Sequence, residues 1–205
     1  DDPGFRASDA FSRAVFPPGH PNRAAPPEKF LADLARTDVA AVRRFHSQFY
    51  GPTGMRLVIV GDIDPAVAQA EIHKAFKDWT GGLAAPAVSK APLLQAARTE
   101  TIFMPDKASV AVVMGQPTQL RYSDPDALPL RLGTRILGSG GFTSRLMANV
   151  RDKEGLTYGI SAFLTDDTFA DGAWSVQADF APPMLAQGIA STRRQIESWH
   201  ADGVT

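Results

Sequence analysis

Apolar residues recur with helical spacing in the first part of the chain. Thr37 can cap a helix whose apolar face carries Val39, Val42, Phe45, His46 and Phe49. The short apolar run 55–60 predicts a strand inside a sheet. Asp64 followed by Pro65 predicts the start of another helix. That helix should end near Trp79 and bury Val67, Ala68, Ile72, Ala75 and Phe76.

The rest of the chain predicts strands followed by helices and a strand pair. Strands are expected near 99–104, 109–114, 158–164 and 173–180, and helices near 129–137, 144–153 and 182–200. Residues 81–92 are rich in Ala, Pro and Gly, which predicts a linker. These patterns predict an α+β fold with mixed, largely antiparallel sheets covered by helices, in two incomplete lobes.

The segment 137–164 carries the strongest functional signal. A glycine-rich turn leads into a short amphipathic helix that should end at Gly155, in the left-handed conformation that glycine favours. The strand that follows should place Tyr158 on the same face as Ile160, Ala162 and Leu164. Arg151, near the helix end, and Tyr158 can then project towards one place. An arginine fork beside a phenol is suited to hold a carbonyl or carboxylate oxygen.

Three other patterns favour structural roles. The glycine-rich turn 138–141 follows a helix and lacks the Gly-Lys-Ser/Thr sequence of a phosphate loop. The spacing of Asp166, Asp167 and Asp171 misses the EF-hand pattern and predicts a solvated hairpin loop. His20 lies in a Gly-His-Pro-Asn sequence, which predicts a loop residue and not a metal ligand.

Composition narrows the classes of partner and chemistry. A net charge of -1 among 205 residues gives no reason to expect nucleic-acid binding, and no apolar run could span a membrane. The chain has no cysteine, which excludes disulfides, thiol catalysis and thiolate metal ligands. A protein without thiols is indifferent to oxidising surroundings, which favours the bacterial periplasm over the cytoplasm.

Two separated sequence blocks resemble a known family. Ser144-Arg145-Leu146 followed by Arg151-Asp-Lys-Glu-Gly-Leu-Thr-Tyr158 forms one block. The other comprises Phe45-His-Ser-Gln-Phe-Tyr50, Met55-Arg-Leu-Val-Ile-Val-Gly-Asp-Ile-Asp64 and Phe76-Lys-Asp-Trp79. In this order and spacing they resemble the pitrilysin/insulinase/mitochondrial processing peptidase family of zinc metallopeptidases. The resemblance covers nearly the whole chain.

The resemblance implies a domain organisation and a division of roles. In that family two similar α+β units are joined by a linker, so 1–80 is expected to be the back part of the first, zinc-bearing unit. Residues 81–92 would be the linker, and 93–205 the front part of the second, substrate-holding unit. In the second unit the family uses an Arg and a Tyr to hold the substrate backbone, which implies that role for Arg151 and Tyr158.

The family's zinc motif, His-x-x-Glu-His, is absent from this sequence. None of the four histidines, His20, His46, His73 and His200, lies in that pattern or its reverse. We therefore expect zinc in the intact protein but no metal ligand and no catalytic residue in this chain.

The resemblance implies that the intact protein is a zinc metalloendopeptidase that hydrolyses peptides or unfolded segments, whereas this chain alone is inactive. Its partners would be the peptide substrate and either the remaining half of the same protein or a homologous subunit. The alternative is a non-catalytic family member that acts as a scaffold or partner subunit of a protease complex.

Overall fold

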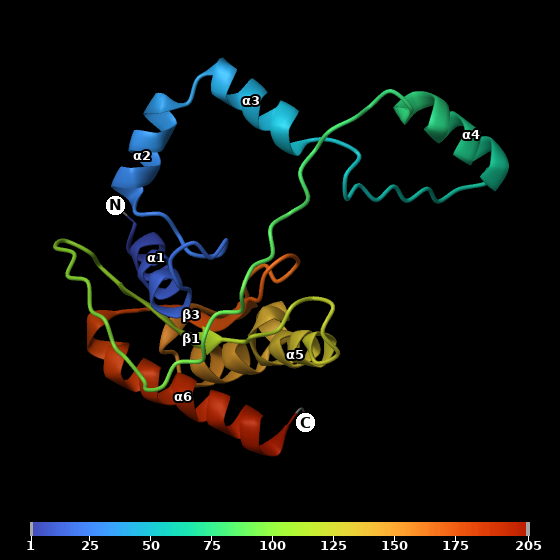
Figure 1. Cartoon of the computed structure of the whole chain (residues 1–205). Coiled ribbons are helices and arrows are strands. Elements are labelled where there is room, and N and C mark those ends of the chain that lie inside the picture. The colour runs from blue at the N-terminus through green and yellow to red at the C-terminus, as the bar shows by residue number, and fades with distance from the viewer. Residues whose placement is uncertain (1, 204–205) are drawn as a thin grey trace. The chain divides into compact units, whose positions relative to one another are not determined.

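A computed structural model describes residues 2–203 of the chain (Figure 1). The chain divides into two compact units. Unit 1 consists of Asp1–Ala24 together with Val88–Thr205, and unit 2 consists of Ala25–Ala87. Unit 2 is therefore inserted between two parts of unit 1 in the sequence.

Unit 2 contains three helices, α2 (Pro27–Arg36), α3 (Val39–Phe49) and α4 (Pro65–Phe76). The predicted start of α4 is confirmed, because the Asp64 carboxylate accepts hydrogen bonds from the backbone N–H groups of Ala66 and Val67. The predicted cap of α3 is wrong by one residue. Asp38, and not Thr37, accepts the backbone N–H of Ala41, because Thr37 ends α2.

The apolar residues of unit 2 are mostly exposed, contrary to the sequence prediction. Only Ala68 is buried in α4, and no residue of α2 or α3 is buried. Residues 55–60 form no strand, and Val58 and Val60 are 80% and 92% exposed. A strand needs a neighbour that pairs its backbone N–H and C=O groups, and the described residues of unit 2 provide none for this run.

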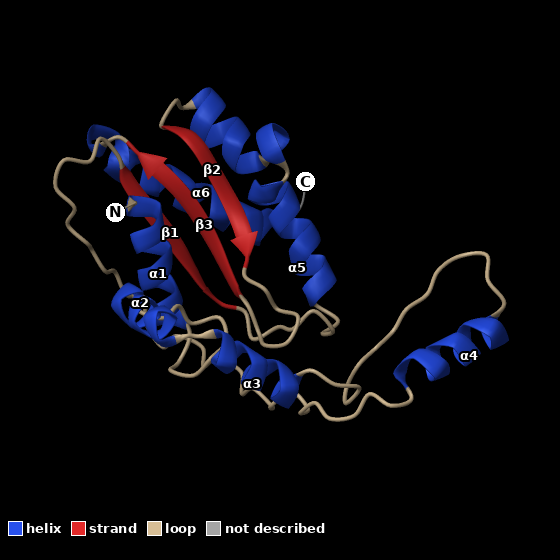
Figure 2. Cartoon of the chain, turned by 90° about the horizontal axis from the view of Figure 1, so that it is seen from above, coloured by secondary structure: helices blue, strands red, loops and turns tan. Residues whose placement is uncertain are grey.

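Unit 1 is built on a three-stranded antiparallel sheet in the order β1-β3-β2 (Figure 2). The strands are β1 (Val110–Pro117), β2 (Thr157–Leu164) and β3 (Ala173–Phe180). Val176 in the central strand pairs with Met114 on one side and Ala162 on the other. The predicted pairing of the last two strands is confirmed, whereas residues 99–104 form no strand.

Helices cover both faces of this sheet. Helix α1 (Pro3–Val15) lies against β1 on one face, where Figure 2 shows it in front of the strands with α6 behind them. The other face packs on α5 (Ala127–Thr134), η1 (Arg135–Ser139), η3 (Met147–Lys153) and α6 (Leu185–Asp202). Two short 3₁₀ turns, η2 (Gly141–Thr143) and η4 (Pro182–Met184), complete the unit.

The main core lies between the sheet and the second set of helices. Its fully buried side chains include Leu137, Leu146, Val150, Ile160, Val176 and Phe180. A smaller cluster joins Val15 and Phe16 of the N-terminal segment to Ala91 and Ala173. The predicted α+β fold, with an antiparallel sheet covered by helices, is confirmed.

The two compact units do not follow the expected family repeats. Residues 2–24 pack within unit 1, and Ala91, in the predicted linker, is fully buried there. The two units are defined by contacts within the fold, and such contacts do not test where one family repeat ends and the next begins. The division into 1–80, 81–92 and 93–205 therefore stays a prediction.

Candidate functional site

The helix that carries Arg151 is wider than an α-helix. Residues Met147–Lys153 form a π-helix, and beyond its end the N–H of Glu154 bonds to the carbonyl of Asn149, five residues earlier, at 3.0 Å. The predicted glycine cap is confirmed. Gly155 has φ 63°, and its N–H donates to the carbonyl of Arg151 at 2.9 Å. Such wide turns within helices occur frequently at functional sites.

An irregular start of β2 places Tyr158 in solvent. The register with β3 shifts between Thr157 and Ile160, both of which are buried. The hydroxyl of Thr157 donates to the carbonyl of Asp179 at 2.6 Å and accepts the N–H of Gly159 at 3.2 Å. Tyr158 is 90% exposed as a result, so the prediction that it shares a face with Ile160 is wrong.

Arg151 and Tyr158 nevertheless lie side by side. The guanidinium carbon of Arg151 is 5.4 Å from the centre of the Tyr158 ring, within the range of a cation–π contact. The same carbon lies 5.1 Å from the centre of the Phe142 ring, and Nη1 donates to the Asp152 carboxylate at 2.9 Å. Sequence reasoning missed Phe142 and Asp152. An exposed phenylalanine directly after two glycines is the signal that could have revealed Phe142.

The geometry of this site suits recognition of an oxygen acceptor. A guanidinium has five N–H donors in one plane, and a cation–π contact does not use these donors. The contact with Asp152 uses one of these donors. The phenol of Tyr158 adds a hydroxyl donor on an exposed side chain. Arg151 and Tyr158 thus bring two kinds of hydrogen-bond donor, a guanidinium and a phenol, to one place on the surface.

The glycine-rich turn before this helix serves packing. A Cβ atom at Gly138 would lie 2.4 Å from the backbone nitrogen of Ala162 and 2.9 Å from Cδ1 of Leu146. Gly138 therefore lets η1 approach β2 closely. Gly141, with φ 73°, adopts the left-handed conformation that begins η2 and precedes Phe142.

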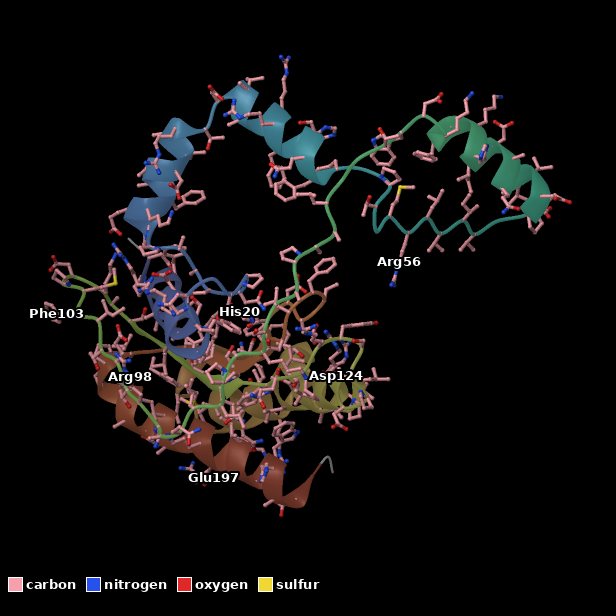
Figure 3. The ribbon with its side chains drawn as sticks, in the orientation of Figure 1. His20, Arg56, Arg98, Phe103, Asp124 and Glu197 are labelled. Carbon is pink, nitrogen blue, oxygen red and sulfur yellow. The ribbon has the colours of Figure 1, made fainter. Side chains whose placement is uncertain are left out.

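The loop between β2 and β3 is more buried than the sequence predicts. Asp171 is fully buried, and its Oδ2 accepts the N–H of Ala91 at 2.9 Å. Its Oδ1 lies 3.2 Å from Nε2 of His20, which is the residue of this contact that Figure 3 labels. Asp167 is also buried and pairs with Arg131, so the predicted solvated loop is wrong for both aspartates. The burial comes from segments distant in sequence, which local spacing does not reveal.

The described residues do not fit a zinc site. Across residues 2–203 no group of three or more His, Cys, Asp or Glu side chains is arranged to hold a metal ion. The His20 ring is buried against Asp171 and stacks on Phe16, while His46 stacks on Tyr50. Over the same residues no helix has both the length and the apolar character needed to cross a membrane.

The comparisons with known sequences agree with one another on the family. The sequence model of the peptidase M16 inactive domain matches residues 37–205. An uncharacterized zinc protease of Streptomyces coelicolor is 27% identical over 213 residues, with all of this chain and 45% of the relative covered. One from Mycobacterium leprae is 28% identical over 211 residues, again with all of this chain and 45% of the relative covered. The chain thus spans about half the length of the curated relatives that it matches.

Solved structures agree in fold. A peptidase M16 inactive domain from Pseudomonas fluorescens has a TM-score of 0.83 at 24% identity, covering all of this chain and 48% of that one. A protease from Helicobacter pylori has a TM-score of 0.64 at 20% identity, covering 86% of this chain and 43% of that one. The sequence model matches well over half of the chain. The resemblance expected from the two sequence blocks is therefore confirmed, and the chain belongs to the peptidase M16 inactive-domain family.

Proposed function

We propose that the chain is part of a zinc metalloendopeptidase that hydrolyses peptide bonds in peptides or unfolded segments. Its contribution is the pair Arg151 and Tyr158, which holds the substrate backbone. The observation that carries this proposal is the convergence of an arginine and an exposed tyrosine at 5.4 Å, across the end of a π-helix. The zinc proteases among its relatives, each about twice as long as this chain, support the proposal.

Within this proposal Arg151 and Tyr158 act on the oxygen of a substrate carbonyl. Negative charge grows on that oxygen when a peptide bond is attacked, so the guanidinium N–H and the phenol O–H would bind it more tightly at that point. Loss of one such donor typically lowers the rate by about 10²–10³-fold. The His-x-x-Glu-His motif and its zinc belong, in this proposal, to the remaining half of the same protein or to a homologous subunit.

The exposure of Tyr158 argues against a purely structural role for the pair. A tyrosine that only packs in a sheet buries its ring, whereas this ring is 90% exposed. Arg151 lies in the last turn of its helix, where a cation also complements the helix dipole. The dipole would be served equally by any cation, so it does not account for the two aromatic rings on the guanidinium.

The test is substitution in the longer, zinc-bearing protein. Arg151→Ala and Tyr158→Phe should each lower kcat/KM for a peptide by about 10²-fold, because each removes one donor to the reacting carbonyl. Zinc content and melting temperature should stay nearly unchanged. Arg145→Ala is the matched control, because Arg145 donates to Ser198 of α6 and not to the site. Unchanged activity in both site variants would remove the pair from substrate binding.

A second measurement concerns the chain alone. Residues 1–205 with added zinc should not cleave peptides, because the described residues do not fit a metal site. Robust zinc-dependent turnover by the purified chain would contradict the proposed division of roles.

The alternative is a non-catalytic scaffold or partner subunit of a protease complex. The parent gene separates the two functions. A His-x-x-Glu-His sequence there supports the peptidase, and its absence supports the scaffold. The bacterial periplasm stays our proposal for the compartment.

A further inference from the structure

Phe142 is an exposed aromatic ring with a specific contact. The side chain is 69% exposed, and the guanidinium carbon of Arg151 lies over the ring at 5.1 Å from its centre. The ring is presented by the short turn η2, which begins at the left-handed residue Gly141. No other part of the fold requires the ring at this place, since Phe142 lies outside both buried clusters of the described residues.

The guanidinium of Arg151 lies over two rings at once, Phe142 and Tyr158. A cation–π contact holds a guanidinium over the ring face, while its N–H groups can still donate hydrogen bonds. Asp152 holds one end of the group through its bond to Nη1. Without Phe142, the long side chain would keep Tyr158 as its only ring contact among the described residues.

We propose that Phe142 is the third residue of the peptide-holding site and positions Arg151 for the substrate carbonyl. Its ring has one face against the guanidinium and remains largely exposed, so it also offers an apolar surface to the bound peptide. The ligand class is an extended peptide with a large apolar side chain next to the held carbonyl. This inference rests on the proposed function of Arg151 and Tyr158.

The wide helix supports this assignment. In η3 the hydrogen bonds span one residue more than in an α-helix, which shifts the residues near its end relative to a regular helix. Arg151 is the residue of this helix that meets the two rings. The irregular start of β2 turns Tyr158 outward, and the glycine turn presents Phe142. Three separate irregularities of the backbone thus converge on one guanidinium.

The experiment compares Phe142→Leu with Phe142→Tyr in the longer, zinc-bearing protein. Leucine removes the ring and keeps an apolar side chain, whereas tyrosine keeps the ring. Phe142→Leu should lower kcat/KM by about 3–10-fold, the loss expected from a contact of this strength. Phe142→Tyr should retain the activity. A peptide with Phe beside the scissile bond should lose more than the same peptide with Ala at that position.

Phe169→Leu is the matched control. Phe169 is 78% exposed in the same unit, and no ring or cation contact is seen for it within residues 2–203. Its substitution should leave kcat/KM unchanged, and the melting temperature of each variant shows that it is folded. A double variant gives the sharper test. If Phe142 acts through Arg151, Phe142→Leu should have little further effect on cleavage of the Ala peptide in an Arg151→Ala background.

The outcomes separate this inference from the proposed function. If Arg151→Ala and Tyr158→Phe impair cleavage while Phe142→Leu does not, the role of Phe142 is refuted and the peptide-holding pair stands. The role of Phe142 is also refuted if Phe142→Leu lowers kcat/KM by the same factor in the parent protein and in the Arg151→Ala variant. If Arg151→Ala and Tyr158→Phe are both fully active, the proposed function fails, and the role of Phe142 fails with it.

Discussion

Gly138 offers the sharpest test of how the core of unit 1 is packed. Gly138→Ala adds one methyl group where η1 meets β2. The new Cβ would lie 2.4 Å from the nitrogen and 2.6 Å from the Cβ of Ala162, and 2.9 Å from Cδ1 of Leu146. Ordinary contacts of such atoms are about 3.5–4.0 Å. The side chain of Leu146 could move, but Ala162 belongs to a strand paired with β3.

The expected loss of stability follows from two opposing terms. Forcing a methyl group into a packed core costs about 1–3 kcal/mol, and the cost is near the upper end when backbone must shift. Alanine is favoured over glycine within a helix by about 1 kcal/mol. The net loss should be about 2 kcal/mol. For a chain of this size that corresponds to a melting temperature lower by roughly 4–8 °C.

Thermal and urea unfolding of residues 1–205, followed by circular dichroism, measure this loss. Gly159→Ala is the matched control, because no atom lies within 4 Å of its added Cβ and its φ is not in the left-handed region. That control should change stability by no more than about 0.5 kcal/mol. A Gly138→Ala chain as stable as the parent would refute the packing argument and reopen other roles for the glycine-rich turn.

Two further predictions concern buried and titrating carboxylates. Asp171→Ala should destabilise the chain by about 2–6 kcal/mol in urea unfolding, because it leaves two buried donors, Nε2 of His20 and the N–H of Ala91, without their acceptor, at about 1–3 kcal/mol each. The exposed Asp126→Ala should have little effect, and equal losses would contradict this reasoning. The backbone N–H of Arg121 and then the Lys90 ammonium hold the pKa of Asp124 below its ordinary value of 3.8. Its stabilisation is therefore present above that value and is lost as pH falls through the lower folded pKa. Asp124→Asn should reduce the fall in melting temperature below about pH 4, and an unchanged acid profile would refute the assignment.

Local sequence predicted the features that depend on a few neighbouring residues. The cap at Asp64, the left-handed Gly155 and the pairing of the last two strands all depend on short-range chemistry. The convergence of Arg151 and Tyr158 was also predicted, since a capped helix and the strand after it are adjacent in the chain.

The features that the sequence did not predict depend on contacts between distant residues or on small irregularities of the backbone. The burial of Asp171 requires residues 20 and 91, which no local spacing connects to it. The outward turn of Tyr158 comes from a shift in register with β3, which alternation of residue types does not encode. The apolar run 55–60 has the composition of a buried strand, but composition cannot supply the neighbour that a strand needs.

The anchoring of residues 2–24 has a consequence for the integrity of the chain. Just before unit 2 the N–H of Ala24 donates to Ser12, and just after it the carbonyl of Val88 accepts from Arg121. Val15, Phe16 and His20 are buried among residues from the second part of unit 1. A single proteolytic cut within 25–87 would therefore leave two fragments held together by this core. The N-terminal fragment would stay bound as a complementing peptide, and the cut would be visible only after denaturation.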